Sequence, residues 1–177
     1  ETNTSSNSVL VNYKGRVEVK ENLNFGSGWH TGAAEILRVT IECLDDKDAI
    51  VFEGGERIRL KINAVAHQNM ERPIIGFYWR DRLGQELFGE NTSACTVLRP
   101  LHLNSGQHFG AQFDFHLPML PNGQYTVTAS LADGNDNKIV QHHYINDALL
   151  VTVTSSKIRW GLVGIQFDGI QIGHQDA

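Results

Sequence analysis

The sequence lacks a long apolar run, a cluster of basic residues and a cysteine framework. Its longest apolar stretches are only a few residues, far short of the roughly 20 needed to cross a bilayer. The 15 Lys and Arg are scattered singly and the formal net charge is −5, so no basic row could neutralise a line of phosphates. Cys43 and Cys95 show no CxxC spacing, and we expect two reduced thiols rather than a disulfide. The sequence therefore predicts no membrane span and no nucleic-acid partner.

Motifs of catalysis and metal binding are also missing. The chain has no G-x-S-x-G elbow and no G-x-x-x-x-G-K-[ST] phosphate loop. His142 and His143 are adjacent and point to opposite faces of a strand, while His108 and His116 lie about 26 Å apart at the strand rise. The acidic residues sit mainly in turns, which does not favour the paired carboxylates of a glycoside hydrolase. We expect no enzyme activity, no metal and no cofactor.

The chain is expected to consist of a short linker and one domain. Residues 1–12 begin with a polar stretch rich in Ser, Thr and Asn and have no initiating Met, which is typical of a linker cut from a longer protein. Residues 13–177 are long enough for a single domain with a sizeable core. With 41% hydrophobic and 20% charged residues, the composition is that of an ordinary globular protein.

Alternation of apolar and polar residues with period two runs through most of the chain, and it is typical of half-buried β-strands. The clearest strand is Gln107–Leu117. Further strands are expected at 37–43, 57–64, 75–80, 125–131, 138–145, 149–154 and 158–172. Turn signals rich in Gly, Asp, Asn and Pro separate them, and no segment shows convincing helical periodicity. The sequence predicts an all-β fold with two antiparallel sheets, because parallel strands would read as continuous apolar runs.

The strand at 75–80 places Tyr78 and Arg80 on the face opposite Ile75, Phe77 and Trp79. A sugar site needs an aromatic ring for the apolar face of a pyranose and planar polar groups for its hydroxyls. Tyr78 and Arg80 are therefore candidate carbohydrate-binding residues. The structural alternatives are a tyrosine at the edge of the core and a solvated surface charge.

Two further groups could complete such a site. Thr126, Thr128 and Ser130 would form a flat polar strip if their strand joins the same sheet, and ordinary exposed strand residues are the alternative. His142 and Tyr144 share a face of their strand, although alternation leaves open whether that face is inner or outer. Together with Tyr78 and Arg80, these residues make up the predicted carbohydrate-binding site.

A series of short motifs follows in order along the chain. They are Phe25-Gly26-Ser27-Gly28, the strand Ile36–Cys43, Gly55-Glu56, Pro73-Ile74-Ile75-Gly76-Phe77, Leu87-Phe88-Gly89 with Asn91-Thr92, and Pro121-x-Gly123-x-Tyr125. This order, over about residues 15–153, resembles the carbohydrate-binding C-terminal domain of Wzt. Wzt is the nucleotide-binding subunit of ABC exporters for O-antigen polysaccharides in Gram-negative bacteria. The stretch from Pro73 to Thr92 is the most specific part of the resemblance.

The resemblance implies an immunoglobulin-like β-sandwich that binds the finished O-antigen polysaccharide by its modified non-reducing end in the cytoplasm, at the inner membrane, and so licenses export. It also implies a preceding ATPase domain, a membrane subunit as partner, and a homodimer formed in some members by exchange of the C-terminal strand. The expected strand at 158–172 is compatible with such an exchange, because a swapped strand covers an exposed edge.

Two features depart from the family pattern. Trp29-His30 is inserted in the Gly-rich segment 25–32, and Trp79 stands where a smaller aliphatic residue is common. We expect Trp29 to anchor a loop and Trp79 to lie in the core. No sugar-contacting position transfers from the resemblance, because these positions vary with the glycan, so the predicted site residues rest on their face assignment alone.

Two other functions are open on the sequence. A structural module that only dimerises the transporter predicts no groove lined by polar and aromatic groups and no affinity for glycans. A glycan-active enzyme of sandwich fold predicts two carboxylates that face one groove.

Overall fold

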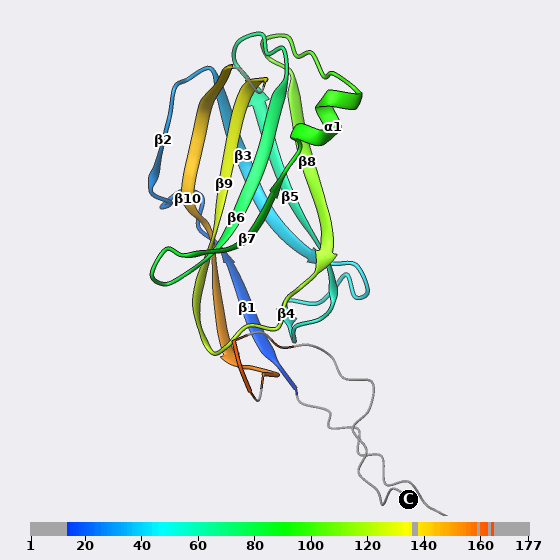
Figure 1. The fold of residues 1–177 in the computed structure, drawn as a ribbon, viewed down its shortest axis with the longest axis vertical. Coiled ribbons are helices and arrows are strands. Elements are labelled where there is room, and N and C mark those ends of the chain that lie inside the picture. Colours follow the sequence, from blue (N-terminus) through cyan, green and yellow to red (C-terminus); the bar gives the residue numbers. More distant parts are fainter. Residues whose placement is uncertain (1–13, 136–137, 159, 163, 165–177) are drawn as a thin grey trace, which may run out of the picture.

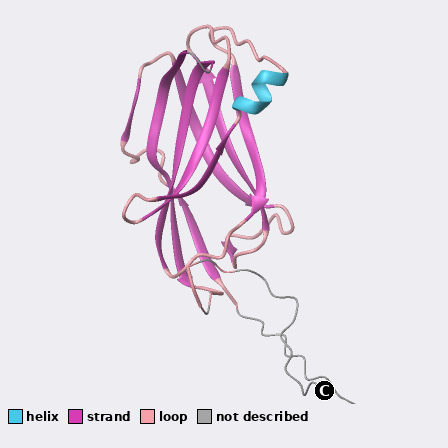
Figure 2. Ribbon diagram, in the orientation of Figure 1, coloured by secondary structure: helices cyan, strands magenta, loops and turns pink. Residues whose placement is uncertain are grey.

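The computed structural model describes residues 14–135, 138–158, 160–162 and 164. Within these ranges most of the chain is β-strand, and the strands form two antiparallel sheets that pack face to face (Figure 1). Figure 2 shows strands in both layers and a short helix near one end. The predicted antiparallel β-sandwich is confirmed.

The larger sheet is 7-stranded, in the order β4-β1-β10-β9-β6-β7, with β2 also paired to β10. Its strands are β1 (Arg16–Glu21), β2 (Gly28–His30), β4 (Val51–Phe52), β6 (Pro73–Asp81), β7 (Glu86–Asn91), β9 (Gly123–Asn135) and β10 (Lys138–Ser155). On one side β10 pairs with β2 and β1 along different parts of its length, and on the other side it pairs with β9. The long strand β10 therefore connects both halves of this sheet.

The smaller sheet is 3-stranded, in the order β3-β5-β8. Its strands are β3 (Ala34–Cys43), β5 (Arg57–Ala66) and β8 (His108–His116). The helix α1 (Ser93–Leu98) follows β7. The sequence does not predict α1, because a helix of 6 residues is too short to show a helical period. Nor does it predict β1, β2, β4 and β7, which are short or mostly exposed.

An aromatic cluster fills the space between the sheets. Trp79 of β6 is fully buried, as expected, and stacks on Phe88 of β7 with ring centroids 5.4 Å apart. Phe77 of β6 meets Phe113 and Phe115 of β8 at 5.0 and 5.7 Å. Because β6 buries Phe77 and Trp79, its intervening residues face away from the core.

Strand β3 departs from simple alternation. The apolar–polar alternation in the strand predicted at 37–43 puts Leu37 on the core face, but Leu37 is 40% exposed, and Ile36 is buried instead. The pairing of β3 with β5 shifts register between Ile36 and Arg38. Such a bulge adds one residue to one strand and moves the following side chains to the other face, which is why the expectation for Leu37 is wrong.

The strands predicted at 138–145 and 149–154 are one strand, β10, interrupted by two register shifts. Cys43 and Cys95 are free thiols, as expected.

The hydroxyl of Tyr125 donates a hydrogen bond to the carbonyl of Pro121 at 2.8 Å, which is the tyrosine-corner arrangement of immunoglobulin-like sandwiches. The expected linker at 1–12 and most of the expected strand at 158–172, with any exchange of it, lie outside the described residues.

His143 of β10 connects the two sheets at one edge. The backbone N–H of Ile36 in β3 donates to its Nδ1 at 2.9 Å, and the ring of His30 meets it edge-on at 5.5 Å. Burial and the neighbouring His30 lower the pKa of His143, and Glu35 raises it in part. Because Nδ1 accepts a hydrogen bond, the neutral ring is the form that fits this position.

We expect the free energy of unfolding to decrease as the pH falls below about 6.5, the ordinary pKa of histidine. Below that pH the unfolded chain binds the proton more readily than native His143 does, so the stabilisation is complete above pH 6.5 and is lost as the pH falls through the lowered native pKa. Urea unfolding at a series of pH values measures this slope. His143→Asn keeps an acceptor for Ile36 without titrating, and it should show a smaller slope than the exposed control His116→Asn. Equal slopes in the two variants would contradict the assignment of this pH dependence to His143.

Candidate functional site

The outer face of the larger sheet carries a groove with a volume of about 490 Å³. It lies over the end of the sheet where β6, β9 and β10 run side by side, and β7 and α1 contribute to its wall. A cleft of this size on a rigid sheet is in the range of sites for small molecules.

Small residues make the floor of the groove. Gly76 of β6 pairs with Ser130 of β9, and the next pair on the same face of the sheet is Ile74 with Ala132. A Cβ at Gly76 would lie 3.0 Å from the Cβ of Asn91 and 3.1 Å from the hydroxyl oxygen of Ser130, closer than side chains normally pack. Glycine at position 76 therefore makes room for the side chains of Asn91 and Ser130, which a Cβ here would crowd.

The walls of the groove combine aromatic, polar and apolar side chains. Tyr78 and Tyr144 both contribute to it, and Tyr78 is 38% exposed. Gln141 of β10 also lines the groove, and its Nε2 donates to the carbonyls of Leu131 and His143 at 3.1 and 2.9 Å. The exposed apolar side chains of Val97 and Ile139 complete the lining, together with Arg72, Glu90 and Asn91.

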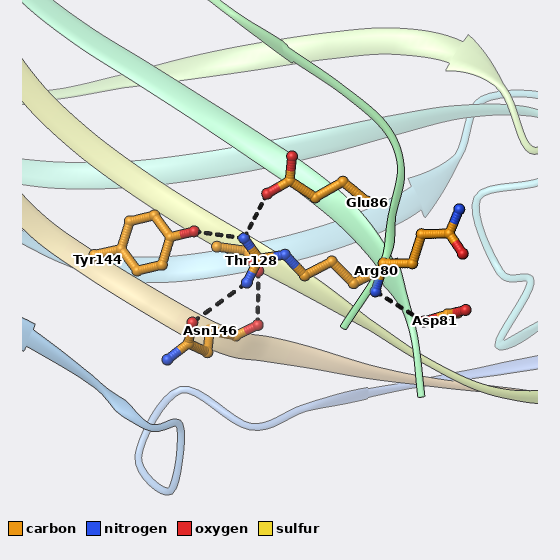
Figure 3. Close-up of polar contacts among 7 residues, drawn as sticks. Arg80, Asp81, Glu86, Thr128, Tyr144 and Asn146 are labelled. Carbon is orange, nitrogen blue, oxygen red and sulfur yellow. Dashed lines mark hydrogen bonds and ion pairs between the residues drawn. The ribbon is translucent and has the colours of Figure 1, made fainter. Parts of the chain in front are cut away.

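Arg80 contacts both tyrosines of the groove, and Figure 3 shows its hydrogen bond to Tyr144 together with its other polar partners. One of its terminal nitrogens, Nη2, donates to the carboxylate of Glu86 and to the hydroxyl of Tyr144, both at 2.7 Å. The other, Nη1, donates to Oδ1 of Asn146 at 3.4 Å. The guanidinium carbon lies 5.8 Å from the ring centre of Tyr78 and 5.9 Å from that of Tyr144, within reach of a cation–π attraction to each ring.

The charge of Arg80 is held firmly. Burial alone would lower the pKa of this guanidinium, but the hydrogen bonds to Glu86 and Tyr144 outweigh it, and the pKa is raised. Its side chain is only 18% exposed, so the ion pair with Glu86 is better shielded from solvent than an ordinary surface pair. The guanidinium of Arg80 therefore stays charged over the whole physiological pH range.

A bulge in β10 supplies the remaining partner of Arg80. The pairing of β10 with β9 shifts register between Ile145 and Leu149, and Asn146 lies in this irregular part. The hydroxyl of Thr128 donates to the carbonyl of Asn146 at 2.8 Å. On the other side, the backbone N–H of Asn146 donates to the carbonyl of Ser27 at 2.8 Å, and the N–H of Ser27 donates to the carboxylate of Asp147 at 2.7 Å. The Gly-rich segment thus braces the bulge that orients Arg80.

A family model described as Wzt C-terminal domain matches residues 26–165. The chain belongs to the Wzt C-terminal domain family. The matched range includes every residue of the groove and of the Arg80 network. Membership of this family supports a role in an O-antigen ABC exporter.

The structure is similar to the crystal structure of the C-terminal domain of wzt, with a TM-score of 0.68 and 17% sequence identity. The similarity covers 81% of this chain and 87% of that one, and it shows that the two share a fold. A search of curated protein sequences finds no match. In the part of the chain that the structure describes, no helix is long and apolar enough to span a membrane.

The Wzt-type sandwich brings most of the predicted site residues to one face. Strands β6, β9 and β10 are neighbours, as a joint site requires. Tyr78, Ser130 and Tyr144 line the groove. Arg80 is held beside it by its hydrogen bonds, and Thr126 pairs with Arg80 across β9 and β6. The face shared by Tyr78 and Arg80 is the outer one, as the alternation predicts.

Two of the predicted residues lie elsewhere than expected. Thr128 is 0% exposed, because its hydroxyl is turned to the carbonyl of Asn146, and it breaks the expected polar strip. His142 lies at the register shift between Gln141 and His143, so it does not share a face of the strand with Tyr144. Its Nδ1 is 3.1 Å from the hydroxyl of Thr31, and Gln141 lines the groove in its place.

Some residues that line the groove are not predicted as site residues from the sequence. Ile74 and Gly76 lie on the same face of β6 as Tyr78, so the alternation already contained the signal for them. Gln141 reaches the groove because of a bulge, and Val97 lies in the short helix α1. Neither feature has a sequence pattern that predicts it.

Among the residues that the structure describes, the groove has few acidic side chains and no cluster of metal-ligating ones. Glu90 is the one acidic residue in its described lining, so the second carboxylate of a glycosidase pair is not at hand. Across the described ranges, no three His, Cys, Asp or Glu side chains gather closely enough to hold a metal ion.

We expect Thr128→Val to lower the free energy of unfolding by about 1–3 kcal/mol. Valine has nearly the shape of threonine, but it leaves the carbonyl of Asn146 without its donor. Urea unfolding measures the loss, with Thr126→Val, half-buried on the same face of β9, as the matched control. Equal effects of the two substitutions would show that the hydrogen bond to Asn146 does not stabilise the bulge.

Proposed function

We propose that this domain binds O-antigen polysaccharide in the groove over β6, β9 and β10 and gives an ABC exporter its cargo specificity. Family membership supports the exporter context. The observation that carries the proposal is the groove itself, where two tyrosines fixed by Arg80 stand beside a floor of small residues. Rigid aromatic rings beside hydrogen-bonding groups suit the apolar face and the hydroxyls of a sugar.

The polar groups of the groove are arranged to meet hydroxyls. The oxygen of Tyr144 accepts from Arg80, so its own proton is available to a ligand. Gln141 uses its Nε2 within the sheet, and its carbonyl oxygen is available as an acceptor. Ser130 adds a hydroxyl at the floor. A neutral ligand with alternating donors and acceptors is the chemistry that this set recognises.

The domain acts by recognition, and the chemistry of transport lies in other parts of the exporter. The lining contains polar and aromatic groups but only Glu90 as a carboxylate among the described residues. We place ATP hydrolysis in a separate ATPase domain, with a membrane subunit as partner, at the cytoplasmic face of the inner membrane. In this arrangement the groove reads the modified non-reducing end of the glycan, and the domain works as a homodimer.

Weak binding is expected for such a ligand. A solvated glycan end exchanges good contacts with water for similar contacts with protein and buries little apolar area. Dissociation constants from millimolar to micromolar, about −4 to −8 kcal/mol, follow from this balance. A polysaccharide exporter must also release its cargo, which such affinities allow.

We expect Tyr78→Ala to weaken binding of O-polysaccharide about tenfold, or about 1.4 kcal/mol, because it removes one of the aromatic walls. The thermal midpoint should change little, because Tyr78 is partly exposed on the outer face. The measurement is a titration of the domain with O-polysaccharides of several serotypes, with and without their terminal caps, by affinity electrophoresis or NMR.

Leu83→Ala is the matched control, because Leu83 is an exposed apolar residue of the same β6–β7 hairpin outside the groove. It should bind as the unaltered domain does. If no capped or uncapped glycan is retained, the cargo-reading proposal fails and a dimerisation role gains support. If binding occurs but Tyr78→Ala leaves it unchanged, the groove is not the binding site.

A further inference from the structure

The register of the larger sheet extends the row of groove residues by one strand. Trp29 of β2 is opposite Tyr144 of β10, which is opposite Ser130 of β9, which is opposite Gly76 of β6. The row ends at Asn91 of β7. Strands lie about 4.8 Å apart, so four such steps from Trp29 to Asn91 span about 19 Å. The groove includes this row from Asn91 to Tyr144, and Trp29 is its next member.

Trp29 shares the outer face with Tyr144. Residues directly opposite each other in an antiparallel pair lie on the same side of the sheet. The neighbouring pair, His30 and His143, has its rings in edge-on contact, and Ile145, the partner of Gly28, is buried in the core. Both neighbours of Trp29 thus belong to the opposite side, which sets Trp29 outward, where it is 50% exposed.

Strand β2 is held in place at both ends. Beyond His30, the N–H of Thr31 donates to the carbonyl of His142 at 2.8 Å. Before Gly28, the carbonyl of Ser27 accepts from Asn146 at 2.8 Å. A Cβ at Gly28 would meet the carbonyl oxygen of Tyr144 at 1.9 Å, so glycine permits this close approach of β2 to β10. Trp29 is therefore a residue of a braced strand with a half-exposed side chain, and not the loop anchor that the sequence predicts.

We propose that Trp29 is the platform for a further sugar ring, so that the site takes an oligosaccharide segment and not only one terminal residue. The proposal rests on the proposed function of the groove. A large, half-exposed indole on a braced edge strand, in register with Tyr144 and the groove floor, offers the flat apolar surface on which a pyranose stacks. The glycan would then run across the strands, from the groove over Tyr144 to Trp29.

The test compares ligands of different length. An O-polysaccharide that the domain retains is partly hydrolysed, and its terminal monosaccharide and a longer oligosaccharide are titrated separately against the unaltered domain, Trp29→Ala and Trp29→Phe. We expect Trp29→Ala to weaken binding of the oligosaccharide about tenfold and to leave binding of the monosaccharide unchanged. Trp29→Phe should restore part of the lost affinity, and Tyr78→Ala should weaken the binding of both ligands.

Fluorescence gives a second readout. Trp79 is fully buried, so in a Trp160→Phe background the indole accessible to acrylamide is that of Trp29. The oligosaccharide should protect it from quenching, and the monosaccharide should not. If Trp29→Ala and the unaltered domain bind the oligosaccharide equally well, and the oligosaccharide gives no protection from quenching, the role of Trp29 is overturned. The groove then remains the proposed binding site. Absence of any glycan binding by the unaltered domain overturns the proposed function itself.

Discussion

The half-buried guanidinium of Arg80 is the constraint on which the outer face of the larger sheet depends. A charge in this position requires partners, because an unpaired buried charge is costly. Glu86, Tyr144 and Asn146 supply them from β7 and β10. Pairing the terminal nitrogens of Arg80 in this way fixes residues on β7 and β10, while its buried Nε has no hydrogen-bond partner among the described residues. The same contacts set the ring of Tyr144 at the edge of the groove.

Irregular pairing of β10 makes this arrangement possible. A regular strand would alternate strictly, whereas the two register shifts bring Gln141 to the groove and Asn146 to Arg80. Bulges of this kind redirect side chains and are frequent near functional sites. The Gly-rich segment that braces the second bulge also contains β2 and Trp29, so the same segment supports the groove and carries its proposed extension.

Period-two alternation is enough to predict the sandwich and the outward face of Tyr78 and Arg80, because the spacing of apolar residues directly reflects the burial of one side of a sheet. It fails where pairing is irregular. Leu37 and His142 lie at register shifts, which move side chains without any change in the local sequence pattern. Thr128 follows the alternation but is covered through the hydrogen bond to Asn146, a contact between residues far apart in the chain that no local pattern contains.

The most direct test of the groove is an NMR titration of the ¹⁵N-labelled domain with a capped O-polysaccharide. The account predicts that amide shifts change at Gly76, Ser130 and Tyr144 and stay constant at Arg59 and Lys61, on the outer face of the smaller sheet. Changes confined to the smaller sheet, or no changes at saturating glycan, would contradict it.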